Sequence, residues 1–330
     1  MHEGYRLLHQ SVILMTQLIS IWGKGGVGKS SCAAAIAYSL AVNNYSVILV
    51  TTDYVPTISK IFGARERCMT QINDIPSLYI FEVTPNEVVR MWKETFGEEV
   101  YRVISSILPV GREILDYIAG APGLGDEFML YIIYQKFSEN EADYIVWDLP
   151  AAGDALRLLY LEKQFYEHLN DAARLYLRLK GFLSKLKRKK APSPLELINK
   201  WRELANYIFK MLSSNEHKAI LISTPEPLSI EVSKRIISDL EIFGINLSAI
   251  IVNMVLSKNL ILKDVFSEKI KLQEKIIRNL KEIAANKKLM YLEVPYLTTD
   301  LSTYKNLNEF CKEIQPLIEF LMMKTKTRLK

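Results

Sequence analysis

The chain has 330 residues, of which 49% are hydrophobic and 24% charged, and its formal net charge is +5. This composition excludes an intrinsically disordered or collagen-like protein. No uninterrupted apolar run reaches the roughly 18 residues that a membrane-spanning helix needs, so an integral membrane protein is not predicted. The length fits two domains, or one α/β domain with an insertion.

The positive charge is concentrated in one segment. Between residues 172 and 202 there are ten basic residues and one acid, Glu196. The basic residues are Arg174, Arg178, Lys180, Lys185, Lys187, Arg188, Lys189, Lys190, Lys200 and Arg202. This segment carries +9 and the rest of the chain −4, so the basicity is local.

The three cysteines, Cys32, Cys68 and Cys311, lie far apart in the sequence and form no CxxC pair. This spacing excludes a disulfide framework and favours a reducing, cytoplasmic location. Residues 11–22 are β-branched and nearly uncharged, which predicts a buried strand rather than a signal peptide. We expect residues 1–14 to be an extension without a chemical role, ahead of one domain spanning 15–330.

A phosphate-binding loop follows this strand directly. Its residues are Gly23, Lys24, Gly25, Gly26, Val27, Gly28, Lys29 and Ser30, and a run of small residues from Ser31 onward predicts a helix. Glycines allow backbone N–H groups to approach phosphate oxygens, and the helix N-terminus adds positive partial charge. We predict that Lys29 contacts the β- and γ-phosphates of ATP and that the Ser30 hydroxyl is a ligand of Mg²⁺.

A second strand, predicted over residues 46–53, ends in Asp53. Ligands of open α/β sheets lie at the carboxyl ends of the strands, so Asp53 is expected to face the γ-phosphate. A third buried strand, residues 144–148, ends in Asp148. The predicted fold is therefore a doubly wound, mainly parallel α/β sheet with the phosphate-binding loop at its carboxyl edge.

These motifs together resemble the ArsA/GET family of ATPases, which couple ATP hydrolysis to arsenite efflux or to the delivery of tail-anchored membrane proteins. The similarity covers residues 51–62 (switch I), residues 121–127, residues 148–159 (switch II), the PE-x-x-S segment at 225–229, and the Val-Asn and Val-Pro pairs at 252–253 and 294–295.

The resemblance implies a role for each matching residue. Asp53 falls on the catalytic aspartate and Asp148 on a metal-associated carboxylate, so the implied metal residues are Ser30, Asp53 and Asp148. Gly153 would direct its N–H group toward the γ-phosphate, and Asn253 and Pro295 would lie beside the adenine. Lys24, which follows the first glycine, marks the deviant class of this loop, in which the lysine reaches the nucleotide of the partner subunit in a homodimer.

Departures from the family pattern fall in both switches. Switch I has Tyr54, Val55, Pro56 and Thr57 where the family has Pro, Ala, His and Asn. In switch II, Leu149 stands for a threonine and Asp154 for a histidine. Whether the altered residues keep hydrolysis coupled to the rest of the protein stays open. The lack of clustered cysteines argues against an interface zinc or an arsenite site.

Two helical stretches, about 87–137 and 155–212, are too long for simple crossovers and are expected to form an inserted helical subdomain. In the second, an apolar stripe with alternating four-three spacing runs from Leu161 to Leu186, and His168 on the same stripe is expected to pack in the core. In the family this subdomain holds the transmembrane segment of a client. The alternative is that the apolar stripes pack against one another as a helix bundle and bind no client.

The favoured function is thus a dimeric, Mg²⁺-dependent ATPase that binds and releases a hydrophobic client. The basic segment 174–202 is a solvated helix end or a contact for an anionic membrane surface, and no specific nucleic acid is predicted. Two alternatives remain open. One is a ParA/MinD-like positioning ATPase that binds membrane or DNA, and the other is a slow regulatory ATPase with altered switches.

Overall fold

The computed structural model describes residues 15–53, 57–64, 69–105, 109–183, 194–257 and 263–326. The predicted extension 1–14, Cys68, most of the altered switch I residues and the basic tip at 187–190 lie outside these ranges. Among the described residues, no helix is both long enough and apolar enough to cross a membrane.

One eight-stranded sheet forms the centre of the described chain. Its strands are β1 (Gln17–Gly23), β2 (Val47–Thr51), β3 (Thr70–Ile72), β4 (Ile75–Phe81), β5 (Tyr144–Asp148), β6 (His217–Ser223), β7 (Leu247–Val255) and β8 (Met290–Pro295). They are arranged in the order β3-β4-β2-β5-β1-β6-β7-β8. All neighbours are parallel except β3 and β4, so the predicted doubly wound, mainly parallel sheet is confirmed.

Two predicted strands have different ends in the structure. The first begins at Gln17, where its pairing with Tyr144 of β5 starts, and residues 11–14 of the predicted strand lie outside the described ranges. The second ends at Thr51, opposite the last residue of β5, Asp148. Asp53 therefore lies two residues beyond the carboxyl end of β2, outside the sheet.

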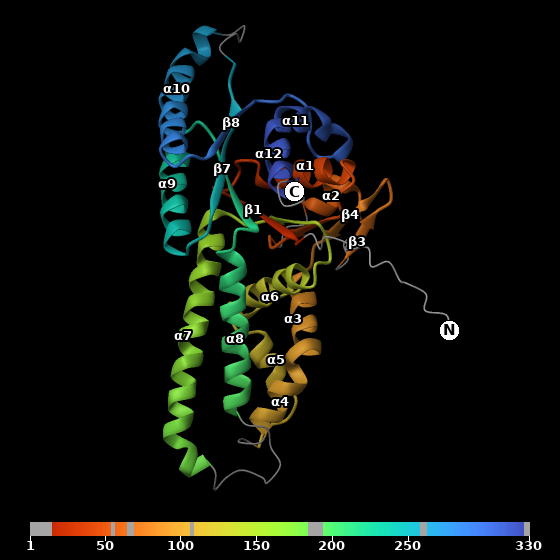
Figure 1. Ribbon diagram of the computed structural model, residues 1–330, viewed down its shortest axis with the longest axis vertical. Helices are drawn as coiled ribbons and strands as arrows, with labels where there is room; N and C mark the ends of the chain where they lie inside the picture. Colours follow the sequence, from red (N-terminus) through yellow and green to blue (C-terminus); the bar gives the residue numbers. More distant parts are fainter. Residues whose placement is uncertain are drawn as a thin grey trace, which may run out of the picture.

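Helices cover both faces of the sheet (Figure 1). One face is covered by α1 (Lys29–Val42), α2 (Ile58–Phe62), the short 3₁₀ segment η2 (Tyr304–Asn306), α11 (Leu307–Glu313) and α12 (Gln315–Lys326). Cys311 lies in α11. On the other face, α9 (Pro227–Ile242) and α10 (Lys263–Asn286) lie along β6, β7 and β8.

The remaining helices form a helical lobe that projects from this second face (Figure 1). The lobe consists of α3 (Pro85–Trp92), the π-helical segment η1 (Lys93–Gly97), α4 (Glu98–Ser105), α5 (Ile114–Ala119), α6 (Leu124–Ser138), α7 (Ala152–Leu183) and α8 (Pro194–Leu212). Helices α7 and α8 run side by side along its length. Its helices lie within residues 85–138 and 152–212.

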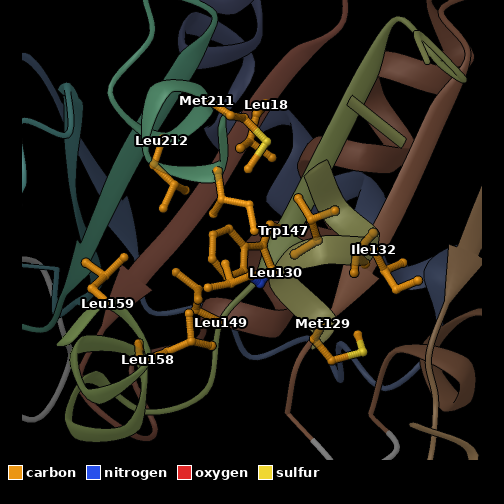
Figure 2. Close-up of a cluster of buried hydrophobic side chains, with 14 of the residues drawn as sticks. Leu18, Met129, Leu130, Ile132, Trp147, Leu149, Leu158, Leu159, Met211 and Leu212 are labelled. Carbon is orange, nitrogen blue, oxygen red and sulfur yellow. The ribbon is translucent and has the colours of Figure 1, made fainter. Parts of the chain in front are cut away.

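An apolar seam joins the lobe to the sheet. Leu18 and Trp147 of the sheet meet Leu130 of α6, Leu159 of α7 and Leu212 of α8 in one buried cluster (Figure 2). Burial of such side chains contributes about 1.5–3 kcal/mol each to stability. The lobe and the sheet therefore share one hydrophobic core.

The expectation for His168 is wrong. Its side chain is exposed on α7, whereas the next buried residue, Leu169, takes the core position. An apolar stripe has a width of more than one residue, so its spacing does not say which side chain at its edge is covered. The fully buried histidine of the described chain is His217, at the start of β6.

Candidate functional site

The phosphate-binding loop lies between β1 and α1. Gly26 and Gly28 have φ values of +80° and +92°, a backbone region that side-chain-bearing residues rarely adopt. Helix α1 begins at Lys29 immediately after Gly28, so its first N–H groups open toward the loop. The Lys29 ammonium donates to the backbone oxygen of Lys24 at 3.2 Å. The Lys29 side chain thus folds back over the loop, whose backbone N–H groups have the geometry to bind an anion.

Asn253, predicted to lie beside the adenine, contacts this loop directly. Its Nδ2 atom donates to Val27 O at 2.9 Å, and its Oδ1 atom accepts from the N–H of Met254 at 2.9 Å. A Cβ atom added to Gly28 would lie only 2.5 Å from the same Nδ2 atom. Asn253 therefore ties the end of β7 to the loop. Pro295 lies opposite Val255 at the ends of β8 and β7.

Asp148 is the buried carboxylate of the site. Burial raises its pKa to about 7, opposed by a hydrogen bond from Ser30 and by the positive charge of Lys29. Its Oδ2 atom also accepts from the Thr51 hydroxyl at 3.5 Å. Its Oδ1 atom is buried and has no hydrogen-bond partner among the described residues. A buried, unsatisfied carboxylate oxygen next to a serine hydroxyl is a donor set that suits Mg²⁺.

Lys29 and Asp53 complete this charged cluster. Burial lowers the pKa of the Lys29 ammonium, while the negative charges of Asp148 and Asp53 act in the opposite direction. The backbone N–H of Asp53 donates to Thr51 Oγ1 at 3.2 Å. The structure therefore brings Lys29, Ser30, Asp53 and Asp148 together from three separate segments, β1–α1, β2 and β5.

Switch II begins with Leu149 and enters α7. Leu149 is buried with Leu130, Trp147 and Leu158 (Figure 2), so a leucine replaces the family's threonine at a position that faces the apolar seam. A Cβ atom at Gly153 would meet nothing within 4 Å, which leaves the first turn of α7 open. Gly153 itself is exposed.

A cavity of about 180 Å³ adjoins Asp53 on the switch II side. It is lined by Thr52, Asp53, Asp126, Pro150, Asp154, Arg157 and Leu158. Arg157 of α7 donates to Asp126 Oδ2 of α6 at 3.2 Å across this cavity. The Asp154 carboxylate, which replaces a histidine of the family pattern, therefore shares a cavity with the predicted catalytic carboxylate.

A buried residue that the sequence analysis missed holds the other end of switch I. Glu82 directly follows β4, and its carboxylate accepts from the backbone N–H groups of Thr57, Ile58 and Ser59. The sequence could have marked Glu82 as a candidate, because, like Asp148, it is an acid at the carboxyl end of a parallel strand. Its partners could not be read from the sequence.

Lys24 lies at the surface of the site. Its ammonium is 4.0 Å from Glu226 Oε2, and both side chains are partly exposed. An ion pair of this length and exposure contributes little to stability, so Lys24 is easily displaced. Ser31 follows in α1.

The thiol of Cys32, the next residue in α1, is fully buried, and burial raises its pKa. A protonated, buried thiol does not act as a metal ligand.

The helical lobe contains an aromatic cluster composed of Trp92, Phe96, Phe128, Tyr131 and Trp201. Phe96 lies at its centre, with ring centroids 5.0 Å from Tyr131 and 6.1 Å from Trp201. The cluster borders a cavity of about 40 Å³. Phe96 belongs to the π-helical segment η1, and such segments occur often at functional sites.

Three described residues of the basic segment have partners within the lobe. Arg174 pairs with Asp171, Lys200 with Glu99, and Arg202 donates to Asn170. These cations are therefore part of the folded lobe as well as of its surface.

The chain is similar in sequence to proteins of one ATPase family. The sequence profile of the family described as anion-transporting ATPase matches residues 16–316. A putative arsenical pump-driving ATPase of Aquifex aeolicus is 28% identical over 304 residues, covering 88% of this chain and 96% of that protein. An ATPase GET3 of Komagataella phaffii is 21% identical over 306 residues, covering 89% and 88%. An ATPase ASNA1 homolog of Babesia bovis is 27% identical over 247 residues, covering 73% and 66%.

Proposed function

Because the chain belongs to the anion-transporting ATPase family, we propose that it is a Mg²⁺-dependent ATPase that acts as a cytoplasmic homodimer and binds a hydrophobic client. The observation that carries the proposal is the meeting of Lys29, Ser30, Asp53 and Asp148 at the end of β1, β2 and β5. No metalloid chemistry is needed for this function.

The chain's own groups fit ATP hydrolysis. The loop N–H groups and Lys29 bind the phosphates, and Ser30 and Asp148 supply oxygen ligands for Mg²⁺. The metal ion would neutralise charge on the β- and γ-phosphates. Asp53 orients a water molecule for in-line attack and accepts its proton. The cavity beside Asp53 gives that water a place on the side of Asp53 away from the loop.

Dimerisation would bring Lys24 to the partner's nucleotide. Its weak pairing with Glu226 leaves the ammonium available for this movement. A second cation at the transferred phosphoryl group stabilises the negative charge of the transition state, as an arginine finger does.

The aromatic cluster of the helical lobe supports an apolar client. Its cavity of about 40 Å³ is far too small for a helix, so client binding requires the helices around it to separate. Nucleotide-driven movement of switch II, which is continuous with α7, provides a route for that opening. The basic segment 174–202 would then face anionic lipid headgroups near the client.

The test is an Asp53→Asn variant in the presence of ATP and Mg²⁺. We expect turnover to fall by about 100-fold or more, because the amide cannot accept a proton, while ATP affinity stays near the wild-type value. Light scattering should then show a stable ATP-bound dimer, and a soluble fusion carrying one apolar helix should copurify with it. A matched fusion with charged residues in the helix is the control.

Each result of this experiment decides one part of the proposal. Wild-type turnover in the variant would remove Asp53 from the mechanism. A monomer, or equal capture of both fusions, would overturn the dimer or the hydrophobic client. Asp154 supports one second candidate, a slow regulatory ATPase, because it adds a negative charge to the cavity beside Asp53. Tight ATP binding with negligible wild-type turnover would favour that candidate.

A further inference from the structure

Glu82 makes a set of contacts that no other described acid of the site makes. Its Oε1 atom accepts from the N–H groups of Thr57 at 3.2 Å and Ile58 at 3.3 Å, and its Oε2 atom accepts from the N–H of Ser59 at 3.0 Å. The residue is only 6% exposed. Both carboxylate oxygens are therefore committed to the backbone at the start of α2.

These contacts replace a cap that α2 does not provide for itself. The first N–H groups of any helix have no partner within the helix. Thr57, at the N-cap position, makes no side-chain cap bond, and the buried Ser59 hydroxyl has no hydrogen-bond partner among the described residues. Glu82 supplies the acceptors from the end of β4, and its negative charge is favourable at a helix N-terminus.

The segment before Asp53 is tied to the sheet as well. The N–H of Thr52 donates to Asp148 O at 3.1 Å, and the Thr52 hydroxyl accepts from Trp147 Nε1 at 3.1 Å. Asp53 follows at once, and three residues separate it from Thr57. Hydrogen bonds to β5 thus fix the chain before Asp53, and hydrogen bonds to Glu82, the residue after β4, fix the chain beyond it.

We propose that Glu82 is a positioning residue for hydrolysis, which fixes the α2 end of switch I so that Asp53 is held at the γ-phosphate. The inference rests on the proposed ATPase function. It needs both carboxylate oxygens, because three N–H donors converge on them. An amide at this position would keep the size of the side chain but would place an NH₂ group against an N–H donor.

The test compares Glu82→Gln with Thr84→Ala. Thr84 is two residues further along and caps α3 in the helical lobe, where its Oγ1 atom accepts from the N–H of Glu87. Each change weakens the start of one helix next to β4, but only Glu82 touches switch I. For each protein we would measure kcat, the Kd of ATP, thermal unfolding, and amide hydrogen exchange of residues 50–62 in the ATP-bound state.

We expect Glu82→Gln to lower kcat by about 10- to 100-fold, since a displacement of about 1 Å at a reacting group has an effect of this size. The Kd of ATP should change by less than about threefold, because the phosphate-binding loop is not altered. Exchange of residues 50–62 should become faster. Thr84→Ala should keep kcat within about twofold of the wild type, even if its unfolding temperature falls by as much as that of Glu82→Gln.

Three outcomes would overturn the inference: wild-type kcat and exchange in Glu82→Gln, an equal loss of kcat in Thr84→Ala, or loss of ATP binding in parallel with kcat. An inactive wild type would instead indicate that the proposed ATPase function is wrong. In that case the exchange measurement still decides whether Glu82 holds switch I.

Discussion

The phosphate-binding loop extends from a strand at the centre of the sheet, whereas the segment that carries Asp53 is bounded by a few polar contacts, made by Thr52 on one side and Glu82 on the other. The loop is fixed by its own glycine conformations, by the start of α1 and by Asn253 of β7. Switch I depends on Glu82, and switch II contacts α6 through the Arg157–Asp126 pair.

This difference separates a preformed region from an adjustable one. Nucleotide phosphates require a cradle that exists before binding, because ordering the backbone on binding would reduce affinity. The switches must instead adopt two arrangements of similar free energy, and a few polar contacts at the edge of a cavity allow this.

The largest effect is expected for Gly28→Ala. Gly28 has φ +92°, and the new Cβ atom would lie 2.5 Å from Asn253 Nδ2, so the variant combines backbone strain with a collision. We expect the unfolding free energy of the nucleotide-free protein to fall by about 2–4 kcal/mol. Urea unfolding measures this loss.

Gly26→Ala is the matched control for this change. Its φ of +80° imposes similar backbone strain, but nothing lies within 4 Å of the added Cβ atom. We therefore expect a loss of only about 1 kcal/mol. A second substitution, Asn253→Ala, should recover part of the Gly28→Ala loss by removing the colliding atom. Equal losses in the two glycine variants would show that strain alone matters and that Asn253 does not restrict the loop.

The next effect concerns the buried network beneath the strand that leads into the loop. His217 Nε2 lies 2.7 Å from Ser20 Oγ, which accepts from Trp22 Nε1, and His217 Nδ1 lies 2.6 Å from Leu212 O. The backbone oxygen can only accept, so Nδ1 carries the proton and Nε2 accepts from the serine. This neutral imidazole joins α8 of the lobe to β1.

Burial lowers the pKa of His217 from 6.5 to about 4. Between these values the unfolded chain binds a proton on this residue that the folded chain does not bind. The contribution of His217 to the free energy of unfolding is therefore fully present above pH 6.5 and is lost as the pH falls toward 4, by about 3 kcal/mol.

Urea unfolding at several pH values would show this slope. In His217→Gln the contribution to the slope should disappear, even if the variant is less stable at every pH. His168→Gln, which changes an exposed histidine of α7, should retain it. An unchanged slope in His217→Gln would assign the acid sensitivity to other groups.

The two regions also differ in how far the sequence predicts them. Gly28, Lys29 and Ser30 are contiguous, so their spacing alone fixes both the chemistry and the geometry of the loop. Glu82 is 23 to 25 residues from its partners in the sequence. Nothing in its neighbouring residues distinguishes it from another acid that follows a strand. Long-range contacts of this kind depend on strand order, which periodicity does not give.

The same limit explains other outcomes. The sheet and the strand 144–148 were predictable because buried parallel strands are continuous apolar runs. The exposed position of His168 was not, since it depends on which neighbours pack against α7. Leu149, a departure from the family pattern in sequence, has a clear reason in the structure, because it contributes to the apolar seam between the sheet and the lobe (Figure 2).

The smallest effect on stability is expected at the contact between Arg157 of α7 and Asp126 of α6. The Arg157 side chain is 59% exposed and that of Asp126 is 24% exposed, so a double-mutant cycle on unfolding should give less than about 1 kcal/mol. The effect on communication should be larger than the effect on stability. In the wild type, ATP binding at switch II should alter amide exchange in the first turn of α6, and Arg157→Ala should remove that response.

Arg174→Ala provides the matched control, because Arg174 pairs with Asp171 within α7 and does not contact α6. It should leave the ATP-dependent exchange of α6 intact. If Arg157→Ala also leaves it intact, the switch signals to the lobe through the continuous backbone of α7 alone. If Arg157→Ala removes the exchange response of α6, the Arg157–Asp126 contact transmits nucleotide binding from switch II to the helical lobe, although it contributes little to stability.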